Sequence, residues 1–168
     1  IAVMKQHKDI IDLIWDKNKD KIDDNEYHDC KFIRSFSIPE TIKQIGENAF
    51  SNSTIAQILL SDTITQIGKS AFENCINLRK ITIPNSIEII PKCSFKGCIS
   101  LTQITIPSSI TSIGKSSFEG CSNLINVTLK QNDKYIENKT QNDYINIIDE
   151  NAFSGCSSLT SFIIPESI

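Results

Sequence analysis

One aromatic position recurs through most of the chain at a nearly constant spacing. The steps between copies are 23, 22, 23, 23 and 35 residues, and the copies are Tyr27, Phe50, Phe72, Phe95, Phe118 and Phe153. Self-similarity at a period of about 20 to 50 residues is typical of a solenoid, because a single repeat cannot bury its apolar edge alone. The pattern predicts about six stacked coils, in which the phenylalanines form one continuous buried stack.

Each unit also carries a segment in which apolar and polar residues alternate. In one unit, Ile104 and Ile106 alternate with Gln103 and Thr105, and Pro107 follows. A period of two is typical of a β-strand with one buried face. The proline ends the strand because it has no N–H to continue the ladder. We therefore expect a parallel strand from every coil, one beside the next.

The full unit can be written Cys-x-x-Leu-x-x-Ile-x-Ile-Pro, followed by a glycine and then the aromatic residue. This unit resembles a leucine-rich repeat and is similar to the BspA-like class, known from bacterial and protist proteins. The resemblance covers about residues 20–168. It implies a leucine-rich repeat solenoid: a right-handed superhelix with one parallel β-sheet and short turns or 3-10 segments on the other side. It also implies a role in adhesion or protein binding at a cell surface.

The chain before residue 20 does not follow the repeat. Residues 2–18 place Val3, Met4, Ile10, Ile11, Ile14 and Trp15 on one stripe of a helix, with charged residues elsewhere. We expect residues 1–19 to form a capping helix over the first coil, because an end coil exposes its core. A helix that binds a partner or a membrane surface is the alternative. The solenoid is expected to span residues 20–168 and to end within an incomplete repeat, so both ends are expected to be cut from something longer.

The residue before each cysteine column indicates a special backbone conformation. This position holds only aspartate, asparagine or glycine, at Asp29, Asn52, Asn74, Gly97, Gly120 and Gly155. These residue types tolerate a left-handed backbone, so we expect a positive φ there. A second glycine column includes Pro91, whose φ is fixed at a negative value, so that column has no such requirement.

The step of 35 residues contains an insertion of about residues 131–142, after which the frame resumes at Ile145 and Ile148. Extra polar segments in a solenoid map to surface loops. One interpretation is a recognition loop that presents Lys134 and Tyr135 to a partner. The other is a tolerated bulge without a binding role.

Five of the six cysteines occupy one column of the repeat. Stacked coils place such a column about 4.8 Å apart with parallel side chains, a direction that argues against disulfides. We expect a ladder of free, buried thiols. Cys93 belongs to a different, polar column, so we expect it to be exposed and unpaired, which favours a reducing compartment.

The sequence has no recognisable catalytic or metal-binding motif. The two histidines, His7 and His28, do not have metal-ligand spacing, and no histidine accompanies the cysteine column. Seventeen basic and twenty acidic residues are interspersed, without a basic stripe for nucleic acid. No apolar run approaches a membrane span, and the first residues do not have the apolar core of a signal peptide. We expect no catalysis, no cofactor and no nucleic-acid partner.

The outward residues of the strands are the predicted binding surface for a protein partner. They are Gln57, Lys80, Thr82, Gln103, Thr105, Asn126 and Thr128. The threonines can also reflect β-propensity alone. Two function classes stay open. The first is a binding module, either for adhesion at a cell surface or as an intracellular, cytoplasmic scaffold. The second is a regulatory or targeting segment of a larger protein that is an enzyme.

Overall fold

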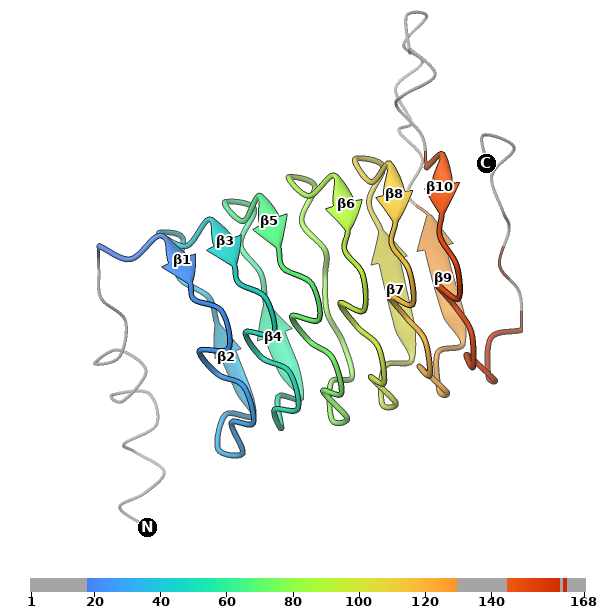
Figure 1. The fold of residues 1–168 in the computed structure, drawn as a ribbon, viewed down its shortest axis with the longest axis horizontal. Coiled ribbons are helices and arrows are strands. Elements are labelled where there is room, and N and C mark those ends of the chain that lie inside the picture. Colours follow the sequence, from blue (N-terminus) through green and yellow to red (C-terminus); the bar gives the residue numbers. More distant parts are fainter. Residues whose placement is uncertain (1–17, 130–144, 161, 163–168) are drawn as a thin grey trace, which may run out of the picture.

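The computed structural model describes residues 18–129, 145–160 and 162. Successive coils are stacked along the longest axis of the molecule, and each coil follows the same path as the one before (Figure 1). This is the predicted leucine-rich repeat solenoid. Apart from Asn18 and Lys19, the predicted capping helix lies outside the described residues, as does the insertion at 131–142.

The strands form two lines along the solenoid. The first line contains a strand of three or four residues from several coils: β2 (Ser35–Ser37), β4 (Gln57–Leu59), β7 (Gln103–Ile106) and β9 (Asn126–Leu129). The second line contains strands of two residues: β1 (Lys21–Ile22), β3 (Gln44–Ile45), β5 (Gln66–Ile67), β6 (Ile89–Ile90), β8 (Ser112–Ile113) and β10 (Ile147–Ile148). Every pairing is parallel and joins equivalent residues of successive coils.

The second line adds to what the sequence predicted. Turns or 3-10 segments were expected on this side, whereas the described residues contain short strands joined by turns and no 3-10 helix. The reason is a second, shorter alternation in each repeat. Ile45, Ile67 and Ile113 point into the core, and the residue before each of them points outward. These strands form two groups of three, β1-β3-β5 and β6-β8-β10, so only β3 and β8 are paired on both sides. Two residues are enough because the stacked coils hold each short strand beside at least one copy of itself.

A third side of each coil is held by a backbone ladder between turns. The N–H groups of Asn48, Phe50 and Asn52 donate to carbonyls of the next coil at 2.9, 2.8 and 2.7 Å. The residues between them donate within their own turn. Within this ladder Asn48 and Asn52 are in the left-handed region, with φ of 53° and 56°, whereas Phe50 between them is not.

The predicted left-handed column is confirmed, and a second one exists. All six residues before the cysteine column have positive φ. A column four residues earlier was not predicted to have this conformation, yet it has φ between 52° and 59° at Asn25, Asn48, Ser70, Cys93, Ser116 and Asn151. Positive φ is uncommon for serine and cysteine. The turn therefore contains two left-handed residues in each described coil. Glycine occurs in only one of these two columns, the one before the cysteine.

The aromatic column forms a stack through the centre of the solenoid. Neighbouring rings from Tyr27 to Phe153 lie 5.2–5.5 Å apart, within 11° of parallel. The four phenylalanines from Phe50 to Phe118 are completely buried, as predicted. Phe153, predicted to be buried, is only partly so, because its second face is covered by the tilted ring of Phe162 rather than by a parallel ring.

The frame resumes after the insertion as predicted. The N–H groups of Ser116, Phe118 and Gly120 donate to carbonyls of residues 150, 152 and 154 at 3.0, 2.8 and 2.8 Å. Strand β10 pairs with β8 in the expected register, and Ile145 is buried. The extra residues therefore leave the stacking of the coils intact.

Candidate binding face

The outward residues of the first line of strands share one face of the solenoid. In β7, Ile104 and Ile106 are buried, whereas Gln103 is exposed. The register with β9 places Asn126 beside Gln103 and Thr128 beside Thr105. We call this surface the sheet face. Its described outward residues are Ser35, Ser37, Gln57, Leu59, Lys80, Thr82, Gln103, Thr105, Asn126 and Thr128.

All of the strand residues predicted to line a binding surface lie on the sheet face. Lys134 and Tyr135, predicted to act from the insertion, lie outside the described residues. Leu59 is the apolar exception among the outward residues, since 61% of it is exposed. The remaining outward side chains near it are hydroxyls, amides and one ammonium group.

The strand ladder of the sheet face is interrupted in the middle. Strands β2 and β4 form one pair and β7 and β9 another, and between the pairs only Gln57 and Lys80 form an isolated bridge. Ile81 and Ile83 are nevertheless buried like their counterparts in β7. The side chains thus keep their alternation where the ladder stops. The sequence of this segment alternates as β7 does, so the pattern does not account for the interruption.

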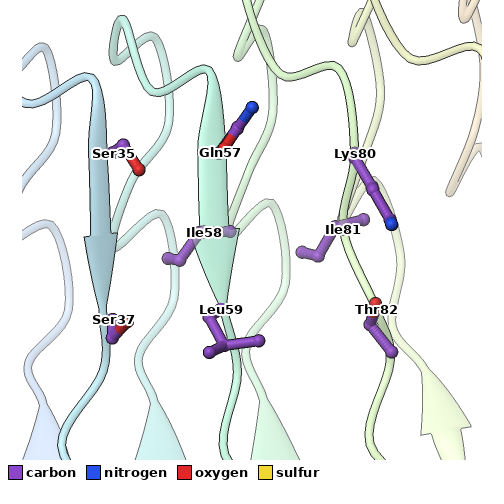
Figure 2. A pocket seen from close by; sticks show the side chains of 8 residues that line it. All are labelled: Ser35, Ser37, Gln57, Ile58, Leu59, Lys80, Ile81 and Thr82. Atoms are coloured by element: carbon purple, nitrogen blue, oxygen red, sulfur yellow. The ribbon is translucent and has the colours of Figure 1, made fainter.

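Two hollows adjoin the interruption. The larger has a volume of about 510 Å³ and lies between β2, β4 and the segment Lys80–Thr82 (Figure 2). The smaller, of about 260 Å³, lies between the same segment and β7. The segment Lys80–Thr82 therefore lines both hollows and separates them. A third hollow of about 350 Å³ lies over β3 and β5, away from the sheet face.

Lys80 is the one charged residue among the described outward residues of the sheet face. It is exposed and lines both hollows. In Figure 2 its side chain extends to the side away from Gln57. None of the ion pairs in the described residues includes Lys80, whereas Lys96 and Lys115 are paired with glutamates at 3.1 and 2.6 Å elsewhere on the solenoid.

A histidine, a serine and an aspartate come together at the first two coils. His28 Nδ1 lies 2.6 Å from Ser51 Oγ, and its Nε2 lies 3.0 Å from Asp29 Oδ2. These residue types form nucleophilic triads in hydrolases. Here, however, Ser51 is 3% exposed and its hydroxyl donates to the carbonyl of Asn48. A substrate cannot reach this hydroxyl, so the cluster acts as a structural link between coils.

The cysteine column is a ladder of free thiols, as predicted. Cys75, Cys98, Cys121 and Cys156 are buried, and Cys30 in the first coil is half-buried. Burial raises the pKa of Cys75 to about 11 and that of Cys121 to about 12. A thiol that keeps its proton is a poor nucleophile and a poor metal ligand. The buried thiols of this column therefore serve packing between coils.

Cys93 does not fully match its prediction. It is free, but it is half-buried rather than exposed. The left-handed backbone at this position, with φ of 57°, and the hydrogen bond of its N–H to Lys115 O hold it inside the turn ladder. Its column was expected to be exposed because it is polar, yet Ser116 in the same column is buried.

Neither a metal cluster nor a membrane-spanning helix occurs in the part of the chain that the structure describes. No three histidine, cysteine, aspartate or glutamate residues there are grouped so that they could hold a metal ion. No helix there has the length and apolar character needed to cross a membrane.

A stack of short coils with a parallel-strand face defines a leucine-rich repeat module, a class used for protein–protein interaction. The chain belongs to the BspA-type leucine-rich repeat family. Six copies of the repeat match the model of this family, over residues 20–144 and 136–168. No curated protein matches the chain.

Solved structures of bacterial leucine-rich repeat proteins share the fold. A leucine-rich repeat protein of T. pallidum is 30% identical, with a TM-score of 0.62, over 64% of this chain and 50% of that one. A leucine-rich cell surface protein of Faecalibacterium prausnitzii is 23% identical, with a TM-score of 0.52, over 91% of this chain and 47% of that one. One from Eubacterium ventriosum is 21% identical, with a TM-score of 0.62, over 92% and 44%. The matched region is thus half or less of each of these chains.

Proposed function

We propose that the chain is a non-catalytic binding module that contacts a protein partner through its sheet face, in the service of adhesion at a cell surface. The observation that carries this proposal is the row of exposed, nearly neutral polar side chains on adjoining strands, beside the exposed Leu59. Such a face has hydrogen-bonding groups and little desolvation cost from charges. The family resemblance supports the adhesive role.

The residues of the sheet face predict that a single module binds its partner weakly. Hot spots of protein interfaces are enriched in tryptophan, tyrosine and arginine. The described outward residues of this face include none of these. Useful affinity would then come from a longer array or from several copies. Once one module of a linked set has bound, the others are held near the partner at a high effective concentration, so the overall affinity exceeds that of a single module.

The test replaces Thr82, Thr105 and Thr128 together with glutamate. This change adds charge to the sheet face without reaching the core, and we expect adhesion to cells and capture of the partner to be lost. A matched control replaces the exposed Gln44, Gln66 and Asn146 with glutamate on other sides of the coils. Circular dichroism checks that both variants keep the fold.

A second variant lacks residues 131–142. If only this deletion abolishes binding, the insertion is the binding site and the sheet face is not. If neither variant loses binding, or if the control loses as much as the threonine variant, the sheet face is rejected as the contact surface.

The alternative function is that of an intracellular scaffold, or of a regulatory or targeting segment. The observation that favours it is that all six cysteines are free, since disulfides form in oxidising compartments and free thiols persist in reducing ones. Protease treatment of intact cells tests the two locations. Digestion of the native protein from outside supports the adhesin, and full protection supports the intracellular module.

A further inference from the structure

The edge from which the strands of the sheet face begin carries only positive charges in the N-terminal half of the solenoid. We call the residues between each cysteine position and its strand the strand-entry edge. In the first and third coils this edge includes Lys31, Arg34 and Arg79, and Lys80 follows as the first outward residue of its segment. The described edge, residues 31–34, 54–56, 76–79, 99–102, 122–125 and 157–159, has no acidic residue.

Most of these cations have no counter-charge in the described residues. Arg34, Arg79 and Lys80 are exposed and take part in none of the ion pairs found there. Lys31 alone is paired, with Asp29 at 3.5 Å, at the exposed surface. The coils are stacked, so the two arginines lie on the same edge: Ala56 N–H donates to Arg34 O, and Arg79 N–H donates to Ala56 O.

The positive edge meets the larger hollow at Lys80, and Arg34 and Arg79 directly precede its lining residues Ser35 and Lys80 in the chain. Ser35 and Ser37, whose side chains are short, lie on one side of the hollow, and Lys80 and Thr82 lie on the other (Figure 2). Leu59 lies between them and is 61% exposed. The hollow thus combines an apolar contact, several hydroxyl groups and a cationic border within one small area.

We propose that this hollow binds an extended segment of a partner protein that carries an acidic side chain next to an apolar one. The carboxylate pairs with Lys80, the two arginines of the edge add to the positive potential, and the apolar side chain packs on Leu59. This inference rests on the proposed function of the sheet face and names the chemistry of its partner. Charge complementarity selects the acidic residue, because unpaired cations on one border favour the opposite sign in the partner.

The geometry favours a peptide over a sulfated polysaccharide. Polyanions are bound by extended basic surfaces, whereas the cations here are confined to the first and third coils. Beyond them, the face over β7 and β9 has no charged outward residue. An exposed leucine in the hollow also offers nothing to a sulfated sugar, whereas it gives a peptide side chain an apolar contact.

The test selects short linear peptides from a displayed random library against the whole chain. We expect the enriched peptides to contain aspartate or glutamate beside an aliphatic or aromatic residue. Their binding should weaken about twofold to fivefold for Lys80→Gln and more for Lys80→Glu, as expected for an exposed charge pair. It should also weaken for Leu59→Ser and as the salt concentration rises.

Two control variants match these changes on other sides of the solenoid. Lys92→Glu reverses the charge of an exposed lysine away from the sheet face, and Ile89→Ser removes an exposed apolar side chain from β6. Both should bind the selected peptides as the unchanged protein does. A heparin column provides the polysaccharide comparison.

The inference is overturned if no peptide is enriched, if the enriched peptides lack acidic residues, or if Lys80→Glu binds them as well as the unchanged chain. The inference is also overturned if no peptide is enriched and the chain is retained on heparin through Lys80. That result would show that the edge binds polysaccharides. If the threonine variant of the sheet face loses its partner while Lys80→Glu keeps it, the proposed function stands and only this inference fails.

Discussion

The thiol of Cys98 donates a hydrogen bond of 3.1 Å to the backbone carbonyl of Phe72, one coil earlier. The same bond joins Cys75 to Phe50, Cys121 to Phe95 and Cys156 to Phe118, at 3.1–3.2 Å. A cysteine in this column therefore does more than fill space. It connects each coil to the turn of the preceding one, next to the stacked rings.

Replacement of Cys98 by alanine should destabilise the protein by about 1 to 3 kcal/mol. The change removes the S–H donor and leaves a small cavity in the column. Cys98→Ser should cost less, because a hydroxyl can donate to the same carbonyl and Ser53 occupies this column naturally. Urea unfolding measures both values. Equal costs for the two variants would show that the hydrogen bond contributes nothing.

Replacement of Phe95 by alanine should cost about 3 to 5 kcal/mol. Phe95 is completely buried between the rings of Phe72 and Phe118, at 5.5 and 5.3 Å, so its loss opens a cavity between two coils. Phe32→Ala is the matched control, because Phe32 is 80% exposed and should be nearly neutral. A thermal melt of each variant gives the comparison. A Phe95→Ala protein that melts like the control would contradict the stacked core.

Features that appear in every repeat could be predicted from the sequence. The alternation in segments such as 103–106 gave the faces of the strands, and the restriction of one column to aspartate, asparagine and glycine gave its left-handed backbone. In both cases the six repeats place six residues in equivalent surroundings. The residue types that occur at that position therefore indicate which property, such as burial or a positive φ, the position requires. The outward placement of the predicted binding residues follows from the same periodicity.

Features that depend on one coil could not be predicted in this way. The bond between His28 and Ser51 joins two coils at the position after the aromatic residue, where Lys96 and Glu119 form an ion pair further along the solenoid. The residue type at this position changes from coil to coil, so the repeat pattern predicts neither contact. The interruption at Ile81 and Ile83 has no sequence signal either. The second left-handed column was not predicted because three of its six residues, Ser70, Cys93 and Ser116, are of types that rarely adopt a positive φ. The asparagines at the other three positions were the only signal for this conformation.

The stability of the fold should decrease above about pH 8.5 because of the buried thiols. An unfolded cysteine titrates near pH 8.5, below the folded pKa values of about 11 for Cys75 and about 12 for Cys121. The folded chain thus keeps protons that the unfolded chain has released. The contribution of these thiols is complete below about pH 8.5 and falls by about 1.4 kcal/mol per pH unit for each, until the pH reaches the folded pKa.

Urea unfolding at about pH 8 and about pH 10 measures this decrease. The control is a Cys75→Ser/Cys121→Ser double variant, in which lysines still titrate but the two thiols do not. Its stability should fall less between the two pH values than that of the unchanged chain. The same decrease in both proteins would assign the alkaline effect to other groups.

Two glycines of the left-handed column should respond differently to alanine. Gly97 and Gly120 have φ of 70° and 73°, so alanine at either position carries the backbone cost of a left-handed residue, about 1 to 2 kcal/mol. At Gly97 a methyl group would also overlap the Asn74 Oδ1 atom. That oxygen belongs to an amide that donates to Asn52 Oδ1 at 3.1 Å, so moving it disturbs a contact between coils.

At Gly120 the nearest atoms to an added methyl group are 3.9 Å away, in the backbone of Gly97. We therefore expect Gly97→Ala to cost about 1 kcal/mol more than Gly120→Ala in urea unfolding. In an Asn74→Gly protein, which has no amide to overlap and no contact to disturb, Gly97→Ala and Gly120→Ala should cost the same. If the two alanine variants are equally destabilised, the amide gives way without cost, and its contact with Asn52 does not stabilise the stack.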